Sequence, residues 1–186
     1  MENIKRILEN FSTEYVEDYK KIWIKTKLTT SADLLEVSKA LKEEGLASLS
    51  TVSPTDFPDI ETIEMNYFFE DLQTKRNLWL KCDIPRALDV CEIASLTPEF
   101  PSANWHEREA FSMFGVRFIG HPDLRPIIAS EDFTGKTPFR KDFDWDAHEK
   151  DMLSNMQIIV DSFKSEQENN EINLDTDSSE MVLNWG

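Results

Sequence analysis

The sequence predicts an α+β fold: a two-layer domain whose mixed or antiparallel sheet of about four to five strands is packed by helices, plus an extended C-terminal tail. Three observations carry this prediction. Segments of period two and segments of helical period follow one another without a repeating strand–helix unit, and three strands come in succession. The 186 residues hold only five glycines. Dinucleotide-binding and phosphate-loop folds need a glycine-rich turn after a strand, so both are excluded.

The N-terminal part predicts two helices around one strand. Residues 3–11 carry apolar side chains at helical spacing, and residues 21–28 alternate as a half-buried strand does. Ser31 is a candidate N-cap for a helix that runs to about Glu44. Gly45 suits the position after that helix, where glycine adopts a left-handed backbone at little cost.

The middle of the chain predicts three further strands in succession. They span residues 46–52, 61–69 and 76–82. We expect the dipeptide Ser53-Pro54 to close the first of them, because proline cannot donate to a ladder. Residues 71–75 make a hairpin between the other two, and residues 86–94 are expected to form a short helix after Pro85.

The formal net charge of −16 limits the partners of this protein. Nucleic-acid binding needs clustered Lys and Arg, which the chain lacks, and an anionic lipid surface would repel it. An acidic surface faces water or meets a basic partner. We therefore expect no nucleic acid among its partners.

The two cysteines and the hydropathy give further limits. Cys82 and Cys91 match no zinc-ribbon spacing, and two thiolates cannot fill a tetrahedral metal site. We expect buried structural thiols in a reducing compartment. No run approaches the roughly 18–20 apolar residues that span a bilayer, and no apolar signal segment follows Met1. The chain is thus expected to be soluble, with membrane association only through a complex.

The most informative block lies at residues 101–128. Asn104 is a good N-cap, and Glu107 stands three residues on, as in a capping box. Glu107 and Glu109 would then lie in the first turn, where acids suit the helix dipole. Gly115 is expected to end the helix. Its aromatic face is expected to comprise Phe111, Phe114 and Phe118.

This block lacks the pattern of a catalytic or metal site. Glu107 and Glu109 are two residues apart on a helix, so their carboxylates point about 200° from each other and cannot share a substrate atom. His106 and His121 form no HExxH motif with Glu107. No Ser or Cys has a His placed to activate it. We expect no catalytic, cofactor-binding or metal-binding residue in the chain.

A positioning role fits these residues better. We hypothesise that Glu107 or Glu109 grips Arg125 or Arg140 through an arginine–carboxylate fork. This grip would hold the loop 121–128 against the helix and present it to a partner; local packing alone remains the alternative. The candidate signature and interface residues are Glu107, Arg108, Glu109, His121, Arg125, Arg140 and Lys141.

The spacing of this block resembles the signature of the 30-kDa subunit family of complex I, the NADH-quinone oxidoreductase. The elements that carry the resemblance are Glu107-Arg-Glu109, His121, Arg125 and Ile127, with the surroundings 100–105, 113–116, 120–125 and 135–142. The likeness is dense over 100–142, weaker over 20–99 and absent in most of the tail. Residues 135–142 carry one inserted residue before Pro138 and have Phe139 where the family has Leu.

Two positions depart from the family pattern. Ser112 stands where the family usually has Asp or Glu, and Pro126 stands where a second basic residue is common. If these positions normally form a salt bridge, this chain lacks it.

The resemblance implies a cofactor-free structural subunit of the peripheral arm of a proton-pumping NADH:quinone oxidoreductase, on the cytoplasmic side of the bacterial inner membrane or the matrix side in mitochondria. It would support the 49-kDa (D) quinone-site subunit, with FMN and iron–sulfur clusters in partner subunits. Two cysteines are too few for a four-thiolate cluster. The alternative is the equivalent subunit of a membrane-bound group-4-type hydrogenase or another relative not driven by NADH. A stand-alone binding module or free-standing enzyme is the third hypothesis.

The sequence divides into a family-like domain at 1–145 and an acidic helix or tail at 146–186. Residues 146–157 predict a helix, and the acidic, polar residues 166–180 predict a mobile tail. The apolar end, 181–186, resembles the opening of the 49-kDa subunit. It would either pair with that partner or mark an unusual split of a fused pair.

Overall fold

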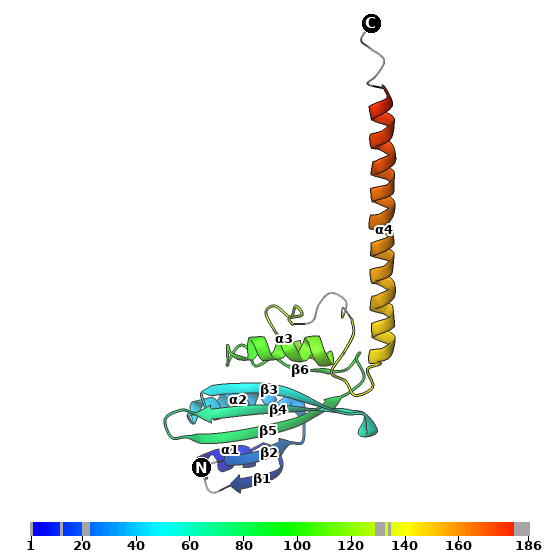
Figure 1. Cartoon of the computed structure of the whole chain (residues 1–186). Coiled ribbons are helices and arrows are strands. Elements are labelled where there is room, and N and C mark those ends of the chain that lie inside the picture. The colour runs from blue at the N-terminus through cyan, green and yellow to red at the C-terminus, as the bar shows by residue number, and fades with distance from the viewer. Residues whose placement is uncertain (1, 12, 20–22, 129–132, 134, 181–186) are drawn as a thin grey trace. The chain divides into compact units, whose positions relative to one another are not determined.

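The computed structural model describes residues 2–11, 13–19, 23–128, 133 and 135–180, and side chains for 2–11, 24–128, 133 and 135–166. The chain forms two compact units, Met1–Phe143 and Asp144–Gly186. The first unit is an α+β domain with a mixed sheet, so the predicted fold class is confirmed (Figure 1).

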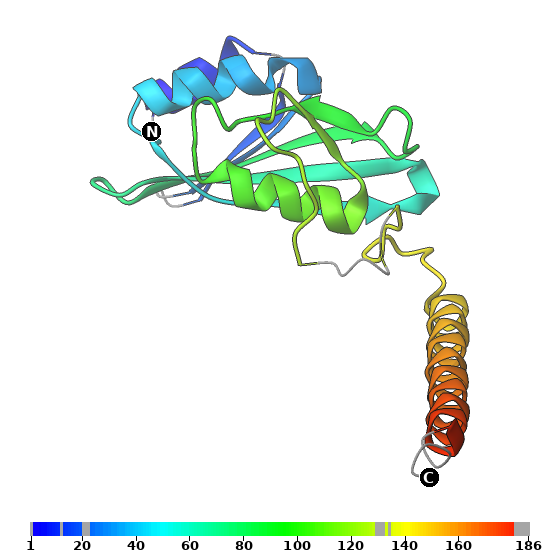
Figure 2. The same ribbon diagram turned by 90° about the horizontal axis from the view of Figure 1, so that it is seen from above.

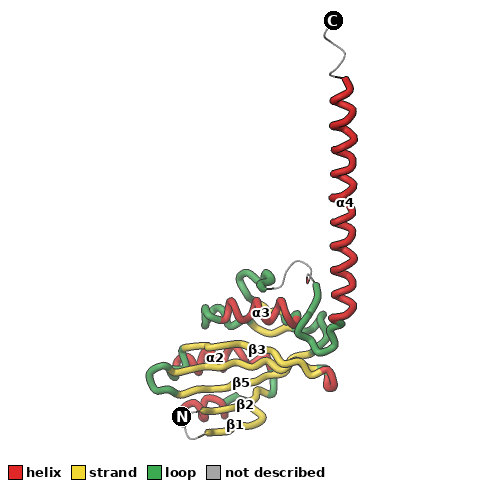
Figure 3. Tube along the Cα trace, in the orientation of Figure 1, coloured by secondary structure: helices red, strands yellow, loops and turns green. Residues whose placement is uncertain are grey.

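A five-stranded sheet of order β1-β2-β5-β4-β3 is the frame of the first unit (Figure 3). Its strands are β1 (Thr13–Tyr19), β2 (Trp23–Leu28), β3 (Ser48–Phe57), β4 (Thr62–Asp71) and β5 (Arg76–Pro85). Only the β2–β5 pair is parallel, and the other neighbours are antiparallel. A small second sheet pairs β6 (Glu92–Ala94) with β7 (Arg117–Ile119) in parallel.

One face of the large sheet carries the core. Along β4, alternate residues from Ile63 to Phe69 are fully buried, and β5 shows the same alternation from Leu78 to Ile84. This period-two pattern is what a sheet with one covered face requires. Two helices, α1 (Glu2–Glu9) and α2 (Leu34–Glu43), lie side by side against it and bury their apolar stripes (Figure 2).

Three expectations about the strands are wrong. The strand at 13–19 was not expected. Its residues are mostly acidic and polar, so they show no clear alternation of apolar and polar side chains, although it forms an edge strand of the sheet. Strand β3 does not close at Pro54 but continues to Phe57; as an edge strand it tolerates a residue without an N–H. Residues 86–94 hold a turn and β6, not a helix. Strand β6 pairs with β7, which follows α3 in the sequence. This non-local pairing outweighs the local helix propensity.

The start of α2 also differs from the expectation. A 3₁₀ turn, η1 (Ser31–Asp33), precedes it, and Thr30 caps that turn: its hydroxyl accepts from the Ala32 amide at 3.3 Å. Ser31 is therefore not the cap. The C-terminal expectation is confirmed, since Gly45 follows the helix with a φ of +105°.

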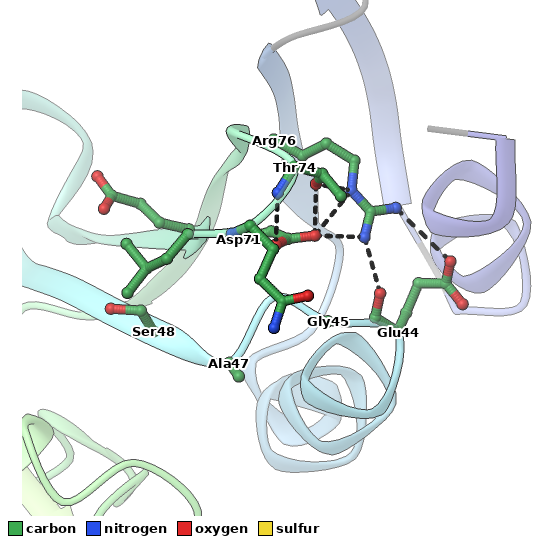
Figure 4. A pocket seen from close by; sticks show the side chains of 10 residues that line it. Glu44, Gly45, Ala47, Ser48, Asp71, Thr74 and Arg76 are labelled. Atoms are coloured by element: carbon green, nitrogen blue, oxygen red, sulfur yellow. Dashed lines mark hydrogen bonds and ion pairs between the residues drawn. The ribbon is translucent and has the colours of Figure 1, made fainter.

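The hairpin expected between β4 and β5 is confirmed, and it is tied to the end of α2 (Figure 4). Asp71 accepts hydrogen bonds from the amides of Gln73 and Thr74, both at 3.0 Å. Arg76 bridges the Asp71 carboxylate at 2.6 Å and the Glu44 carbonyl at 2.9 Å. Hydrogen bonds from Thr74 and Arg76 hold the pKa of Asp71 well below its usual range. Glu44, Asp71, Thr74 and Arg76 line an open surface pocket, and their hydrogen bonds join the turn to α2.

The second unit consists of α4 (Trp145–Glu180), a helix of 36 residues. A helix ending near residue 157 is therefore the wrong expectation, and the segment 166–180, predicted as a mobile tail, is helical. Neither Pro nor Gly interrupts residues 145–180, so nothing in the backbone stops the helix. The apolar end predicted to meet a partner, 181–186, lies outside the described residues. No described helix has the length and apolar character that a bilayer crossing needs.

The buried hydroxyl of Tyr67 is expected to lower the stability of the fold. Tyr67 is fully buried, and its hydroxyl has no hydrogen-bond partner in the described part of the chain. Burying an unpaired hydroxyl costs free energy, so Tyr67→Phe is expected to raise the free energy of unfolding by about 1 kcal/mol in urea denaturation. Phe69→Leu, on the same strand and face, is the control and should lower it. A destabilised Tyr67→Phe variant would show that the hydroxyl is paired.

Candidate functional site

The signature helix α3 (Ala103–Phe114) packs against the edge strand β3. It follows Ser102, whose hydroxyl donates to the Leu49 carbonyl of β3 at 2.9 Å instead of capping the helix. The small residues Ala103 and Ala110 are buried against the core. Gly115 ends the helix as expected, with a φ of +74°. This left-handed backbone favours glycine, and a Cβ there would also lie 2.7 Å from Leu88 Cδ2, so that side chain would have to shift.

Glu107 is fully buried and anchors the segment after β6. Its carboxylate accepts from the Ser95 hydroxyl at 2.6 Å and from the Leu96 amide at 2.7 Å. Ser95 Oγ in turn accepts from the amide of Thr97 at 3.1 Å. The capping box with Asn104 is therefore wrong: the helix begins at Ala103, and Glu107 lies a turn inside it, on the side that faces the core.

The buried environment changes the acidity of Glu107. Burial raises its pKa from 4.5 to about 7, although the hydrogen bonds from Ser95 and Leu96 favour the carboxylate. No ion pair to Glu107 occurs among the residues whose side chains are described. Desolvation without a countercharge is therefore the dominant cause. A group held this way is enclosed in the domain and does not face a substrate.

Arg108 and His121 hold the loop that follows β7. Arg108 Nε donates to the Arg125 carbonyl at 2.9 Å, and its guanidinium lies over the Trp105 ring at 5.3 Å. His121 Nδ1 accepts from the Asp123 amide at 3.0 Å. Its Nε2 therefore carries the proton and donates to the Asn104 carbonyl at 3.3 Å. These bonds fasten the loop to the exposed side of α3.

Ser112 completes the attachment of this loop. Its hydroxyl donates to the Arg108 carbonyl and accepts from the Ile127 amide, both at 2.8 Å. A serine at this position satisfies a backbone donor of the loop directly. The departure from the family's acidic residue therefore does not leave the loop unattached.

The predicted grip of an acid on an arginine is wrong. Arg125 is exposed and pairs with Asp123 at 2.7 Å. Arg140 is buried and donates to the carbonyls of Phe114 at 2.8 Å and Arg86 at 2.6 Å. One backbone carbonyl at the end of α3 and one just after β5 accept from its guanidinium, so no carboxylate of the signature helix is needed there. Arg140 holds the segment after the loop instead.

A buried ion pair that the sequence prediction missed lies beside Arg140. Asp56, at the end of β3, pairs with Arg86 at 2.7 Å and accepts from the Lys141 amide at 2.8 Å. Burial alone would raise the pKa of Asp56, but the bonds from Arg86 and Lys141 bring it below its usual value. The Lys141 side chain lies over the Phe57 ring at 5.3 Å. No spacing in the sequence signals this pair, because its two members lie thirty residues apart.

Glu109 differs from its two neighbours in the signature. Its side chain is exposed, and in the part of the chain whose side chains are described it makes no hydrogen bond or ion pair. It lines a groove between α3 and β3, together with the aromatic rings of Phe114 and Phe139. The fold thus uses Glu107 and Arg108 but leaves the Glu109 carboxylate available to solvent.

The two thiols behave as structural residues. Cys82 and Cys91 are free and buried, as expected. Burial raises the pKa of Cys82 to about 12, and burial also raises that of Cys91 although Arg140 opposes the shift. Neither is a thiolate at neutral pH. Across the described residues, no cluster of three or more His, Cys, Asp or Glu side chains is placed to hold a metal ion.

This geometry defines a two-layer α+β domain whose signature helix organises loops and presents one unpaired acid. The profile of the family described as "Respiratory-chain NADH dehydrogenase, 30 Kd subunit" matches residues 28–149, more than half of the chain. The chain therefore belongs to the 30-kDa subunit family of the respiratory-chain NADH dehydrogenase, and the resemblance found in the sequence is confirmed.

Two of the curated relatives illustrate the match. A subunit of the NADH-quinone oxidoreductase of Moorella thermoacetica is 41% identical over 118 residues, which cover 62% of this chain and 78% of that protein. A subunit of the F(420)H(2) dehydrogenase of Methanosarcina mazei is 35% identical over 96 residues, covering 52% and 60% respectively. The chain spans about three fifths of the length of several of these relatives.

Two solved structures share the fold. A chain of the membrane-bound sulfane sulfur reductase, an archaeal respiratory membrane complex, superposes with a TM-score of 0.74 and 25% identity, covering 81% of this chain and 89% of that one. A trypsin-resistant fragment of Nqo5 (1–134) superposes with a TM-score of 0.55 at 23% identity, covering 66% and 99%. The second likeness concerns the fold alone.

The acidity of Glu107 predicts a pH-dependent stability. Because the folded-state pKa is raised, this group contributes stability that is fully present below about pH 4.5 and is lost as the pH rises through about 7. The change is on the order of 3 kcal/mol. Glu107→Gln keeps an oxygen that can accept from the Leu96 amide, turns an N–H donor toward Ser95 Oγ and does not titrate. It should therefore remove this part of the profile in urea denaturation from pH 4.5 to 8.

Glu109→Gln, on the exposed side of the same helix, is the matched control and should keep the profile of the unaltered protein. If the unaltered protein and Glu107→Gln gave parallel profiles, the buried carboxylate would not be the titrating group.

Proposed function

We propose that the chain is a cofactor-free structural subunit in the peripheral arm of a proton-pumping NADH:quinone oxidoreductase, where it supports the 49-kDa quinone-site subunit. One observation carries this proposal: the signature residues are used to build and fasten a surface. Glu107 holds the segment after β6, and Arg108 holds the loop after β7. Glu107 and Arg108 make hydrogen bonds within the fold, and Glu109 is exposed without a second titratable group paired to it among the described side chains.

The proposal assigns the redox chemistry to partner subunits, which would carry FMN and the iron–sulfur clusters. In this chain Cys82 and Cys91 are buried and protonated, so they are poor ligands for a cluster. The chain would lie peripherally, on the cytoplasmic or matrix side, and reach the membrane through its partners. The acidic excess would be partly solvated and partly matched to basic surfaces of neighbouring subunits.

A second candidate is the equivalent subunit of a relative that is not driven by NADH, such as a group-4-type hydrogenase. Two comparisons favour it: the relative from an F(420)H(2) dehydrogenase, and the structural likeness to a membrane-bound sulfane sulfur reductase. A subunit without a redox centre of its own would serve different electron donors equally well. The composition of the complex decides between the two candidates.

The test is purification of the tagged full chain from its own cells in mild detergent. The proposal expects a quinone-site subunit together with FMN- and iron–sulfur-bearing subunits, whereas a nickel-site subunit would identify the second candidate. The isolated chain is expected to show no flavin or iron–sulfur absorbance. A chain that is found alone, or that reduces quinone with NADH unaided, would contradict the proposal.

The end of α4 generates a separate prediction. The buried core that folds the first unit lies within Met1–Phe143, and residues 166–186 lie wholly outside that core. Deleting residues 166–186 is therefore expected to lower recovery of the chain with its complex more than it lowers the midpoint of urea unfolding. Equal losses of assembly and stability would contradict this assignment. A deletion of residues 2–9, which removes the buried Ile4 and Leu8, is the contrasting control and should lower both.

A further inference from the structure

A groove between the edge strand β3 and the signature helix has no role in the interactions described so far. Residues 51–54 of β3 line one part of it, and Ala110 and Met113 of α3 line another. Phe114 and Phe139 add two aromatic rings, which pack edge to face with centroids 5.8 Å apart. The cavity volume is about 230 Å³. The floor is apolar, because the buried side chains of Ala110 and Met113 form it.

The mouth of this groove carries one charge. Glu109 lines the groove and is exposed, and no described side chain pairs with it. The arginine beside it in sequence, Arg108, is directed to the Arg125 carbonyl and the Trp105 ring. The described fold therefore leaves both an unfilled apolar hollow and an unpaired carboxylate at the same place.

The size and the edge of the groove limit its occupant. A volume of about 230 Å³ is below the roughly 300–1,000 Å³ of small-molecule sites, and suits one or two side chains. Strand addition to β3 is disfavoured, because Pro54 has no N–H and a bulge interrupts the ladder between Leu49 and Thr51. Insertion of side chains fits this geometry better than a ligand or an added strand.

Charge then selects the chemistry of the occupant. The exposed carboxylate at the mouth would form an ion pair with Arg or Lys. The apolar floor would pack against a bulky aliphatic or aromatic side chain. A second copy of this chain is a poor occupant, since each copy carries a net charge of −16 and the two would repel each other. The complementary partner is a different, locally basic polypeptide.

We propose that the groove between β3 and α3 is a docking site for a segment of a partner subunit in which Arg or Lys lies next to a bulky apolar residue. The apolar side chain fills the hollow beside Phe114 and Phe139, and the cation pairs with Glu109. This inference rests on the proposed assembly function and names the surface through which it acts. It gives Glu109 the partner-facing role that Glu107 and Arg108 do not have.

The test has two parts, both in the full chain expressed in its own cells. A photo-activated benzoylphenylalanine replaces Ser53, an exposed residue that lines the groove, and a second variant carries it at the exposed Glu36 of α2 as the control. The first variant should crosslink to one partner subunit at a segment with Arg or Lys beside a bulky apolar residue. The Glu36 variant should not give that product.

The second part reverses the charge. Glu109→Lys is expected to lower recovery of the chain with the complex about ten-fold, without changing its unfolding midpoint. Glu43→Lys, also an exposed helical acid, is the matched control and should leave recovery unchanged. Changing the crosslinked Arg or Lys of the partner to Glu should restore recovery of Glu109→Lys, which a merely structural role of Glu109 would not allow.

The outcomes separate this inference from the proposed function. If the unaltered chain assembles but Glu109→Lys assembles equally well, or if the Ser53 crosslink joins a second copy, a lipid or no protein, the groove proposal is overturned and the assembly function stands. If the unaltered chain enters no complex, both are overturned.

Discussion

The buried carboxylate of Glu107 is the interaction on which the arrangement around the signature helix depends. It joins the middle of α3 to Ser95 and Leu96, and so fixes the segment that carries Phe100 into the core against Phe69. Burying a carboxyl group without a countercharge costs free energy, which the raised pKa of Glu107 records. Two strong hydrogen bonds and the close packing of the helix on β3 offset that cost. The helix is therefore held at a fixed depth against the edge of the sheet.

Other residues of the signature block hold the segments that surround this helix. Arg108 and Ser112 fasten the loop after β7 through its backbone, so the loop keeps its course without a salt bridge to α3. Arg140 holds the following segment by the carbonyls of Phe114 and Arg86. Among Glu107, Arg108 and Glu109, the exposed side chain is that of Glu109. The three adjacent residues of the signature thus divide between the core, the loop and the surface, as expected for a rigid platform that positions other proteins.

The sequence predicted the architecture well because period-two alternation in β4 and β5 and the stripe of α2 are local signals of a covered face. It failed where non-local contacts decide. The pattern Asn104 to Glu107 matches a capping box, yet the helix starts two residues earlier than that cap implies, and Glu107 reaches Ser95, twelve residues back. The Asp56–Arg86 pair joins residues thirty apart, for which no spacing rule exists. Arginine has too long a reach for its partner to be read from sequence, so the grip on Arg125 or Arg140 was assigned wrongly.

Glu107 is the structural anchor of the signature helix, and amide hydrogen exchange on the full chain tests this role most directly. In Glu107→Ala we predict that the Leu96 amide loses its protection, with faster exchange spreading through residues 95–100 while the amides of β4 and β5 keep theirs, since opening at the signature helix is local. If protection at Leu96 equalled that of the unaltered protein, the carboxylate would not hold this segment and the account would be contradicted.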